Sequence, residues 1–187
     1  MTLTLAFDTS GPWCAAALLR GDAVLATRAE EMAKGQAERL MPLLEDLLAE
    51  HGYAWADLDR IGVGTGPGNF TGIRIAVSAA RGLALALNIP AVGVSTFDAI
   101  HHDAPEALAG VPAPRDHLYV RAPGGAPAYI REAEAPGAPM LPPAPAALVT
   151  AMARVAAAAP NGPPPAPLYI KPADAAPSRD APPVRLG

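Results

Sequence analysis

The stretch Gly64-Thr65-Gly66-Pro67-Gly68-Asn69-Phe70-Thr71-Gly72 follows a short apolar segment, residues 61–64, and precedes an apolar helical segment, residues 73–88. Glycines at the start of a helix let backbone amides crowd together, which makes a binding place for phosphate or another anion. The stretch lacks the Gly-Lys-Ser/Thr ending of a Walker loop, and its glycine spacing does not fit the dinucleotide fingerprint. A tight structural turn explains the same glycines equally well.

The segments around this loop alternate between strand and helix signals. Strands are predicted over 2–7, 13–20, 23–29, 61–64 and 91–94, and helices over 36–51 and 73–88. A tight turn at Gly21 and Asp22 joins the second and third strands into a hairpin. The strand-helix-strand order after residue 60 indicates a parallel pair with a right-handed crossover. These patterns predict an α/β fold.

A second loop, Asp8-Thr9-Ser10-Gly11, follows the first strand. An aspartate that leaves a strand into a turn of small residues can hold a magnesium-bound water, while the following amides face a phosphate. Aspartate and serine are also ordinary turn formers, so a structural turn is the alternative.

Composition changes near residue 104, because 4 of the 23 prolines precede it and 19 follow it. We therefore predict an N-terminal lobe over residues 1–103 and a reduced, proline-rich second lobe with an extended tail over residues 104–187. The second part carries a predicted strand pair, 117–121 and 128–132, and an alanine-rich helix over 146–159. Prolines mark residues 136–145 and 160–167 as extended connections.

Bulk composition favours a soluble cytoplasmic protein that does not hold RNA by itself. The formal net charge is −4, whereas RNA binding draws on many Lys and Arg contacts to phosphate. A single cysteine, Cys14, excludes an internal disulfide, and the first residues lack the pattern of a signal peptide. We find no apolar stretch of the roughly 20 residues that a membrane span needs.

Four segments together resemble the TsaB family, also called YeaZ. They are Phe7-Asp8-Thr9-Ser10, Arg39-Leu40-Met41-Pro42, the glycine loop continued by Ile73-Arg74, and Gly93-Val94-Ser95-Thr96. The resemblance covers about residues 1–100 and resumes loosely at residues 115–120 and 167–174. It implies an actin-like fold of the sugar kinase and Hsp70 superfamily, which is ribonuclease H-like.

The resemblance also implies a function. TsaB is the bacterial partner of TsaD, which binds metal and nucleotide and transfers a threonylcarbamoyl group to adenosine 37 of tRNA, and an ATPase called TsaE joins them. We therefore expect a non-catalytic subunit with TsaD-like and TsaE-like partners, which contacts tRNA mainly through the complex. The second lobe looks shortened against the family, and Pro112 stands where the family often has an aspartate. Any ATP or ADP should therefore be bound weakly.

The residues themselves agree with a missing catalytic centre. The four histidines, His51, His101, His102 and His117, include no pair separated by one helical turn, so we expect no metal site and no catalytic residue. Cys14 is expected to be a buried structural thiol. The residues predicted to form the phosphate or nucleotide loops are Asp8, Thr9, Ser10, Gly64, Gly66, Gly68, Thr71 and Gly72.

Two apolar helices supply the expected partner surface. Arg74, Ser78 and Arg81 form one narrow polar stripe on the second helix, and the rest of that helix is apolar or small, so it should be buried on more than one side. Small residues would let a partner helix approach closely, whereas packing of the second lobe is the alternative. The interface residues predicted are Met41, Leu44, Leu48, Ile73, Ala76, Ala80 and Ala84.

Two rival functions stay open on the sequence alone. One is an independent enzyme of the same superfamily, either a sugar-kinase-like phosphotransferase or a glycopeptidase. The other is a stand-alone homodimer, because the same helices could meet their own copies through an isologous contact.

Overall fold

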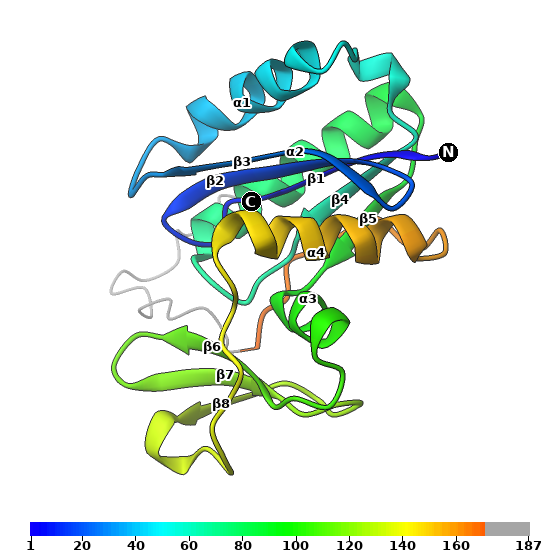
Figure 1. Ribbon diagram of the computed structural model, residues 1–187. Helices are drawn as coiled ribbons and strands as arrows, with labels where there is room; N and C mark the ends of the chain where they lie inside the picture. The colour runs from blue at the N-terminus through cyan, green and yellow to red at the C-terminus, as the bar shows by residue number, and fades with distance from the viewer. Residues whose placement is uncertain (171–187) are drawn as a thin grey trace, which may run out of the picture.

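The computed structural model describes residues 1–170 and places a five-stranded mixed sheet at its centre (Figure 1). The strand order is β3-β2-β1-β4-β5, with β1, β2 and β3 antiparallel and β1, β4 and β5 parallel. The strands are β1 (Leu3–Asp8), β2 (Trp13–Arg20), β3 (Ala23–Glu31), β4 (Arg60–Gly64) and β5 (Ala91–Val94). The predicted opening hairpin and the predicted parallel pair are both confirmed.

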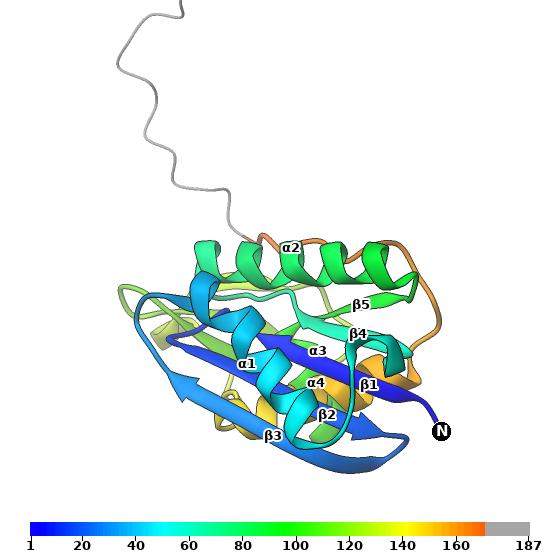
Figure 2. The ribbon, with the colours of Figure 1, turned by 90° about the horizontal axis from the view of Figure 1, so that it is seen from above.

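Helices cover both faces of this sheet. Helices α1 (Gln36–Glu50) and α2 (Phe70–Leu87) lie side by side over one face (Figure 2), and α4 (Pro145–Ala158) lies over the other (Figure 1). Strand β2 shows why both faces need cover, because Cys14, Ala16 and Leu18 join the core under α1 and α2. The intervening residues Ala15, Ala17 and Leu19 pack with α4 instead. The period-2 alternation of side chains thus places apolar groups on each face of the strand.

Helix α4 comes from the second half of the chain but packs on the first sheet. Its residues Val149 and Ala153 share a buried cluster with β1 and β2. Arg60 of β4 holds the end of the helix, because its guanidinium donates to the carbonyls of Ala156, at 3.0 Å, and Ala159, and to Asn161 Oδ1 at 2.8 Å. A division of the chain at residue 103 therefore separates α4 from the sheet that it covers.

A smaller antiparallel sheet, β6-β7-β8, lies below α3 and α4 in Figure 1. Its strands are β6 (Ala109–Ala113), β7 (His117–Arg121) and β8 (Ala128–Arg131), and α3 (Thr96–Asp103) precedes it. The predicted strand pair and the α4 helix are confirmed, whereas β6 was not predicted. Pro112 hid it, and an edge strand tolerates proline because one side of its backbone needs no partner strand.

The ends of two helices follow their capping residues. Helix α2 begins three residues earlier than predicted, because Asn69 Oδ1 accepts the amide N–H of Gly72 at 2.9 Å. Ser95 and Asp98 form a capping box at the start of α3. By length and composition alone α2 passes as a membrane span, with a mean hydropathy of 1.4 over 18 residues. In this fold it is the crossover between β4 and β5.

Residues 160–170 run back along the sheet edge as an extended segment. The amide of Leu168 donates to the carbonyl of Thr65 at 2.9 Å, and Pro165 lies against Gly93 of the edge strand β5. The tail predicted to lie extended over the surface, residues 171–187, falls outside the described residues.

Candidate functional site

The two predicted loops meet at one edge of the large sheet. Strands β1 and β4 are parallel neighbours, so Asp8 and Gly64 end them at the same edge. The loops then bond to each other: Thr9 Oγ1 donates to the carbonyl of Gly72 at 2.6 Å, and the amide of Asn69 donates to the carbonyl of Ser10 at 2.6 Å. The structure therefore brings together the loop residues that the sequence singled out.

The glycines of the second loop allow the two loops to pack directly against each other. A Cβ added to Gly72 would lie 1.8 Å from the carbonyl oxygen of Thr9, and one added to Gly68 would lie 2.5 Å from that of Ser10. Both distances are far below any van der Waals contact. The glycines of the second loop are thus needed for the close approach of the first loop. This agrees with the interpretation of the glycine-rich stretch as a tight structural turn.

Of the other predicted loop residues, Thr71 is exposed in the first turn of α2, whereas Gly66 is buried with a φ of 93°, which favours glycine.

Asp8 is the buried carboxylate at the floor of this junction. Its Oδ2 atom accepts hydrogen bonds from Trp13 Nε1 at 2.9 Å, Ser10 Oγ at 3.0 Å and the Ser10 amide at 3.2 Å. Its Oδ1 atom is buried and has no hydrogen-bond partner among residues 1–170. Burial raises the pKa of Asp8 above its ordinary value, although the bonds from Trp13 and Ser10 act in the opposite direction.

Trp13 is the site residue that the sequence did not reveal. Its indole covers Gly11 so closely that a Cβ there would lie 2.2–2.4 Å from three atoms of the six-membered ring. The same side chain packs against the buried clusters formed with α4. From sequence, a tryptophan at the start of a strand is interpreted as a core residue. The signal that could have indicated its role in the site is its position directly after Asp8-Thr9-Ser10-Gly11-Pro12.

A cavity of about 550 Å³ opens beside this junction, between the two sheets. One wall carries Ser10, Trp13 and Asn69, and the other carries Val111 and Tyr119 of the small sheet. The cavity is therefore the cleft that the predicted loops face.

The histidines have contacts that need no metal. The His51 ring meets the Leu47 carbonyl, and the His101 ring lies between the Arg121 guanidinium, at 3.2 Å, and the Ala107 carbonyl, at 3.1 Å. The remaining two are His117, which stacks on Tyr129, and His102, which lies 4.0 Å from Asp103. Within residues 1–170, no three or more His, Cys, Asp or Glu side chains are placed to hold a metal ion.

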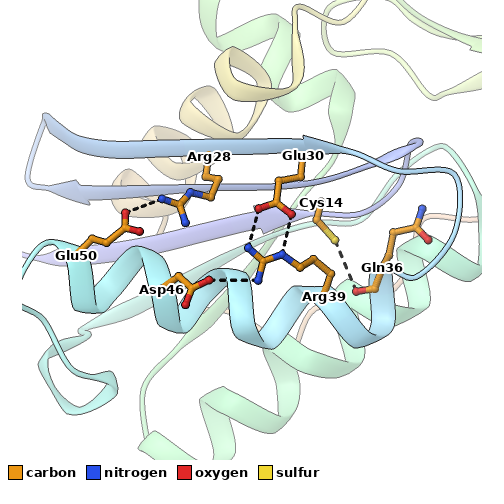
Figure 3. Close-up of polar contacts among 7 residues, drawn as sticks. All are labelled: Cys14, Arg28, Glu30, Gln36, Arg39, Asp46 and Glu50. Carbon is orange, nitrogen blue, oxygen red and sulfur yellow. Dashed lines mark hydrogen bonds and ion pairs between the residues drawn. The ribbon is translucent and has the colours of Figure 1, made fainter.

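Cys14 is fully buried, as predicted. Its Sγ atom lies 3.6 Å from the Gln36 carbonyl at the start of α1 (Figure 3). Burial, with a smaller contribution from Glu30, raises the pKa of this thiol to about 11. The thiol is therefore protonated and inert at neutral pH.

The predicted partner surface is wrong for most of its residues. Five of the seven lie in the core between the helices and the large sheet, with at most 2% of their surface exposed: Leu44, Leu48, Ile73, Ala76 and Ala80. The other two, Met41 and Ala84, are half-buried against that core. Ala76 and Ala80 let this chain's own sheet approach α2 closely, so these two small residues are not available to a partner.

Helix α1 is also tied to the sheet through its polar side. Figure 3 shows Arg39 pairing with Glu30 of β3 through two bonds of 2.7 Å and with Asp46 at 3.2 Å. Arg28 of β3 reaches Glu50 near the end of the same helix at 2.6 Å. These ion pairs hold α1 over the outer strand of the sheet. On the exposed side of α2, Arg74 donates to the Tyr169 hydroxyl at 2.8 Å.

Comparison with known proteins shows which sequences this chain resembles. A family model described as "TsaD: tRNA N6-adenosine threonylcarbamoyltransferase" matches residues 27–122, which is half of the chain. The protein named "tRNA threonylcarbamoyladenosine biosynthesis protein TsaB" of Escherichia coli (strain K12) is 37% identical over 93 residues, 50% of this chain and 40% of the relative. The protein of the same name from Bacillus subtilis (strain 168) is 41% identical over 96 residues, 51% of this chain and 42% of the relative. The matches thus span less than half of these relatives' length.

Solved structures extend the likeness over the whole fold. A structure described as "an uncharacterized protein with similarity to peptidase YEAZ from Pseudomonas aeruginosa" superposes with a TM-score of 0.74 at 26% identity, covering 91% of this chain and 100% of that chain. "YeaZ from Pseudomonas aeruginosa" gives a TM-score of 0.66 at 29% identity, covering 82% and 91%. The predicted actin-like α/β fold is confirmed, and the chain belongs to the TsaB/YeaZ family, whose members share the TsaD-type domain.

Proposed function

We propose that this chain is a non-catalytic, cytoplasmic partner subunit that supports threonylcarbamoyl transfer to adenosine 37 of tRNA by a TsaD-like catalytic subunit. Its curated relatives are named as tRNA threonylcarbamoyladenosine biosynthesis proteins. The family model that matches it is that of the transferase, so chain and catalytic subunit would be related domains. A TsaE-like ATPase is the third component of the proposal.

The observation that carries the non-catalytic role is the state of Asp8. In this chain the loops that would face a phosphate bond to each other, and the carboxylate between them is engaged by Ser10 and Trp13. We therefore propose that any ATP or ADP is held weakly, because these groups already bind one another. A net charge of −4 supports a role in which tRNA is held mainly by the other subunits.

The partner surface in this proposal is the exposed side of α2, which we call the α2 stripe. Its residues are Arg74, Ser78, Arg81, Gly82 and Leu85. Leu85 is 85% exposed, and only 28% of the residues of this apolar helix are buried by the rest of the chain. A Cβ added to Gly82 meets no atom within 4 Å, so a partner helix can approach there.

The second lobe is, in this proposal, a reduced and proline-rich form of the family's second lobe. The curated relatives extend well beyond the part that this chain matches, which supports that reading.

In isolation the α2 stripe would also allow a homodimer, because a two-fold axis brings the same patch of two copies together.

The test combines the chain with its TsaD-like and TsaE-like partners and measures tRNA modification together with the mass of the complex. Leu85→Glu should weaken the complex at least about tenfold, because it places a charge in an apolar contact. Leu141→Glu is the matched control, since Leu141 is 50% exposed but lies beside the small sheet. Equal binding by both variants would remove the α2 stripe from the interface.

Two further results would refute the function itself. One is tRNA modification that proceeds equally well with the chain left out. The other is phosphotransfer to a sugar, or cleavage of a glycopeptide, by the purified chain alone.

A further inference from the structure

The indole of Trp13 lies over the first loop, at the phosphate side predicted from the sequence. Its six-membered ring lies flat over Gly11, and its N–H points to Asp8 Oδ2 at 2.9 Å. One side chain of the chain itself thus contacts both Gly11 and the Asp8 carboxylate. Ser10 supplies the other two donors to the same oxygen.

Asp8 and its surroundings do not fit a magnesium nucleotide. A magnesium-bound water must donate to a carboxylate oxygen that solvent can reach. Oδ2 already accepts three hydrogen bonds, and Oδ1 faces Gly64, where an added Cβ would lie 2.0 Å away from it. Asp8 is 0% exposed, so neither oxygen is open to the cleft.

We propose that Trp13 is an internal plug, which excludes magnesium nucleoside diphosphates and triphosphates from the cleft between the two sheets. The inference deepens the proposed function, on which it rests for the expectation that nucleotide is weakly held. It adds the side chain responsible: the indole occupies the phosphate side of the cleft and donates the hydrogen bond that a metal-bound water would make.

The plug is fixed in place from two sides. Trp13 belongs to the wall of the 550 Å³ cavity, yet it also packs against two buried clusters that include Val149 and Leu148 of α4. Swinging the ring out would expose that apolar surface and leave Asp8 with one donor fewer. A nucleotide would therefore have to bind and displace the ring at once, which weakens its apparent affinity.

The test is calorimetric titration of the full chain with MgADP, which is separate from any readout of tRNA modification. Trp13→Leu keeps an apolar side chain against α4 but removes the ring over Gly11. Trp55→Leu is the matched control, because Trp55 packs in the core cluster under α1 and α2, away from the cleft. We expect no measurable binding by the wild type or the control up to about 1 mM, and at least about tenfold tighter binding by Trp13→Leu.

Two outcomes would overturn the plug. One is a folded Trp13→Leu variant that binds MgADP no better than Trp55→Leu, and the other is low-micromolar binding by the wild type. If Trp13→Leu does not fold, Trp55→Leu carries the test, since Trp13 is then the remaining tryptophan of the chain. Its emission should stay that of a shielded indole and should not change with MgADP; a change on adding MgADP would show that the ring yields to nucleotide.

Discussion

Replacing Ala80 by arginine tests which side of α2 the fold itself needs. Ala80 is 0% exposed and lies in the main core cluster, so an arginine side chain there has no path to solvent without moving the helix. Overpacking alone costs about 1–3 kcal/mol, and a buried unpaired charge costs several more. The sum of at least about 4 kcal/mol is a large part of a total stability of about 5–15 kcal/mol.

We therefore expect Ala80→Arg to melt at least about 10 °C below the wild type, or to be unfolded, when the purified chain is followed by circular dichroism. Ser78→Arg is the control on the same helix, because Ser78 belongs to the exposed α2 stripe and its substitution should change the stability by less than about 0.5 kcal/mol. Equal melting temperatures for the two variants would refute the assignment of the small-residue ridge to the core.

Three further experiments test the site and the packing of the helices around it. Gly72→Ala should destabilise the chain severely in urea unfolding because its Cβ would clash with the Thr9 carbonyl, whereas Gly82→Ala in the same helix should stabilise it by about 0.5–1 kcal/mol; similar effects would contradict the loop contact. Arg60→Ala should cost about 2 kcal/mol in the same assay by freeing the carbonyls at the end of α4, and no loss would show that the clamp is not made. Cys14, with its pKa raised to about 11, should resist alkylation at pH 8 in the native chain, react faster as the pH rises toward 11, and react at once in denaturant; fast native labelling detected by mass spectrometry would show that the thiol is not buried.

Much of the fold was predictable because its signals are local. The alternation in β2, the leucine spacing of α1 and the turn at Gly21 each depend on neighbouring residues alone. The meeting of the Asp8 loop with the glycine loop is a finding of the structure, because only the fold makes β1 and β4 adjacent parallel strands that end side by side. Strand β6 was not predicted, because Gly110 and Pro112 weaken the strand signal in its sequence. Its position at the edge of the small sheet, where proline is tolerated, is known only once β7 is placed beside it.

The sequence by itself determined the α/β order, the two loops and the family resemblance, because each of these is written in contiguous residues. Only the tertiary structure decided which side of α2 is buried, since Ala76 and Ala80 would serve a partner helix as well as they serve this chain's own sheet. It also decided the state of the cleft: Trp13 reaches Asp8 only because β2 folds back beside β1 and α4 returns beneath it. Such contacts depend on distances between segments far apart in the chain, and no local pattern encodes them.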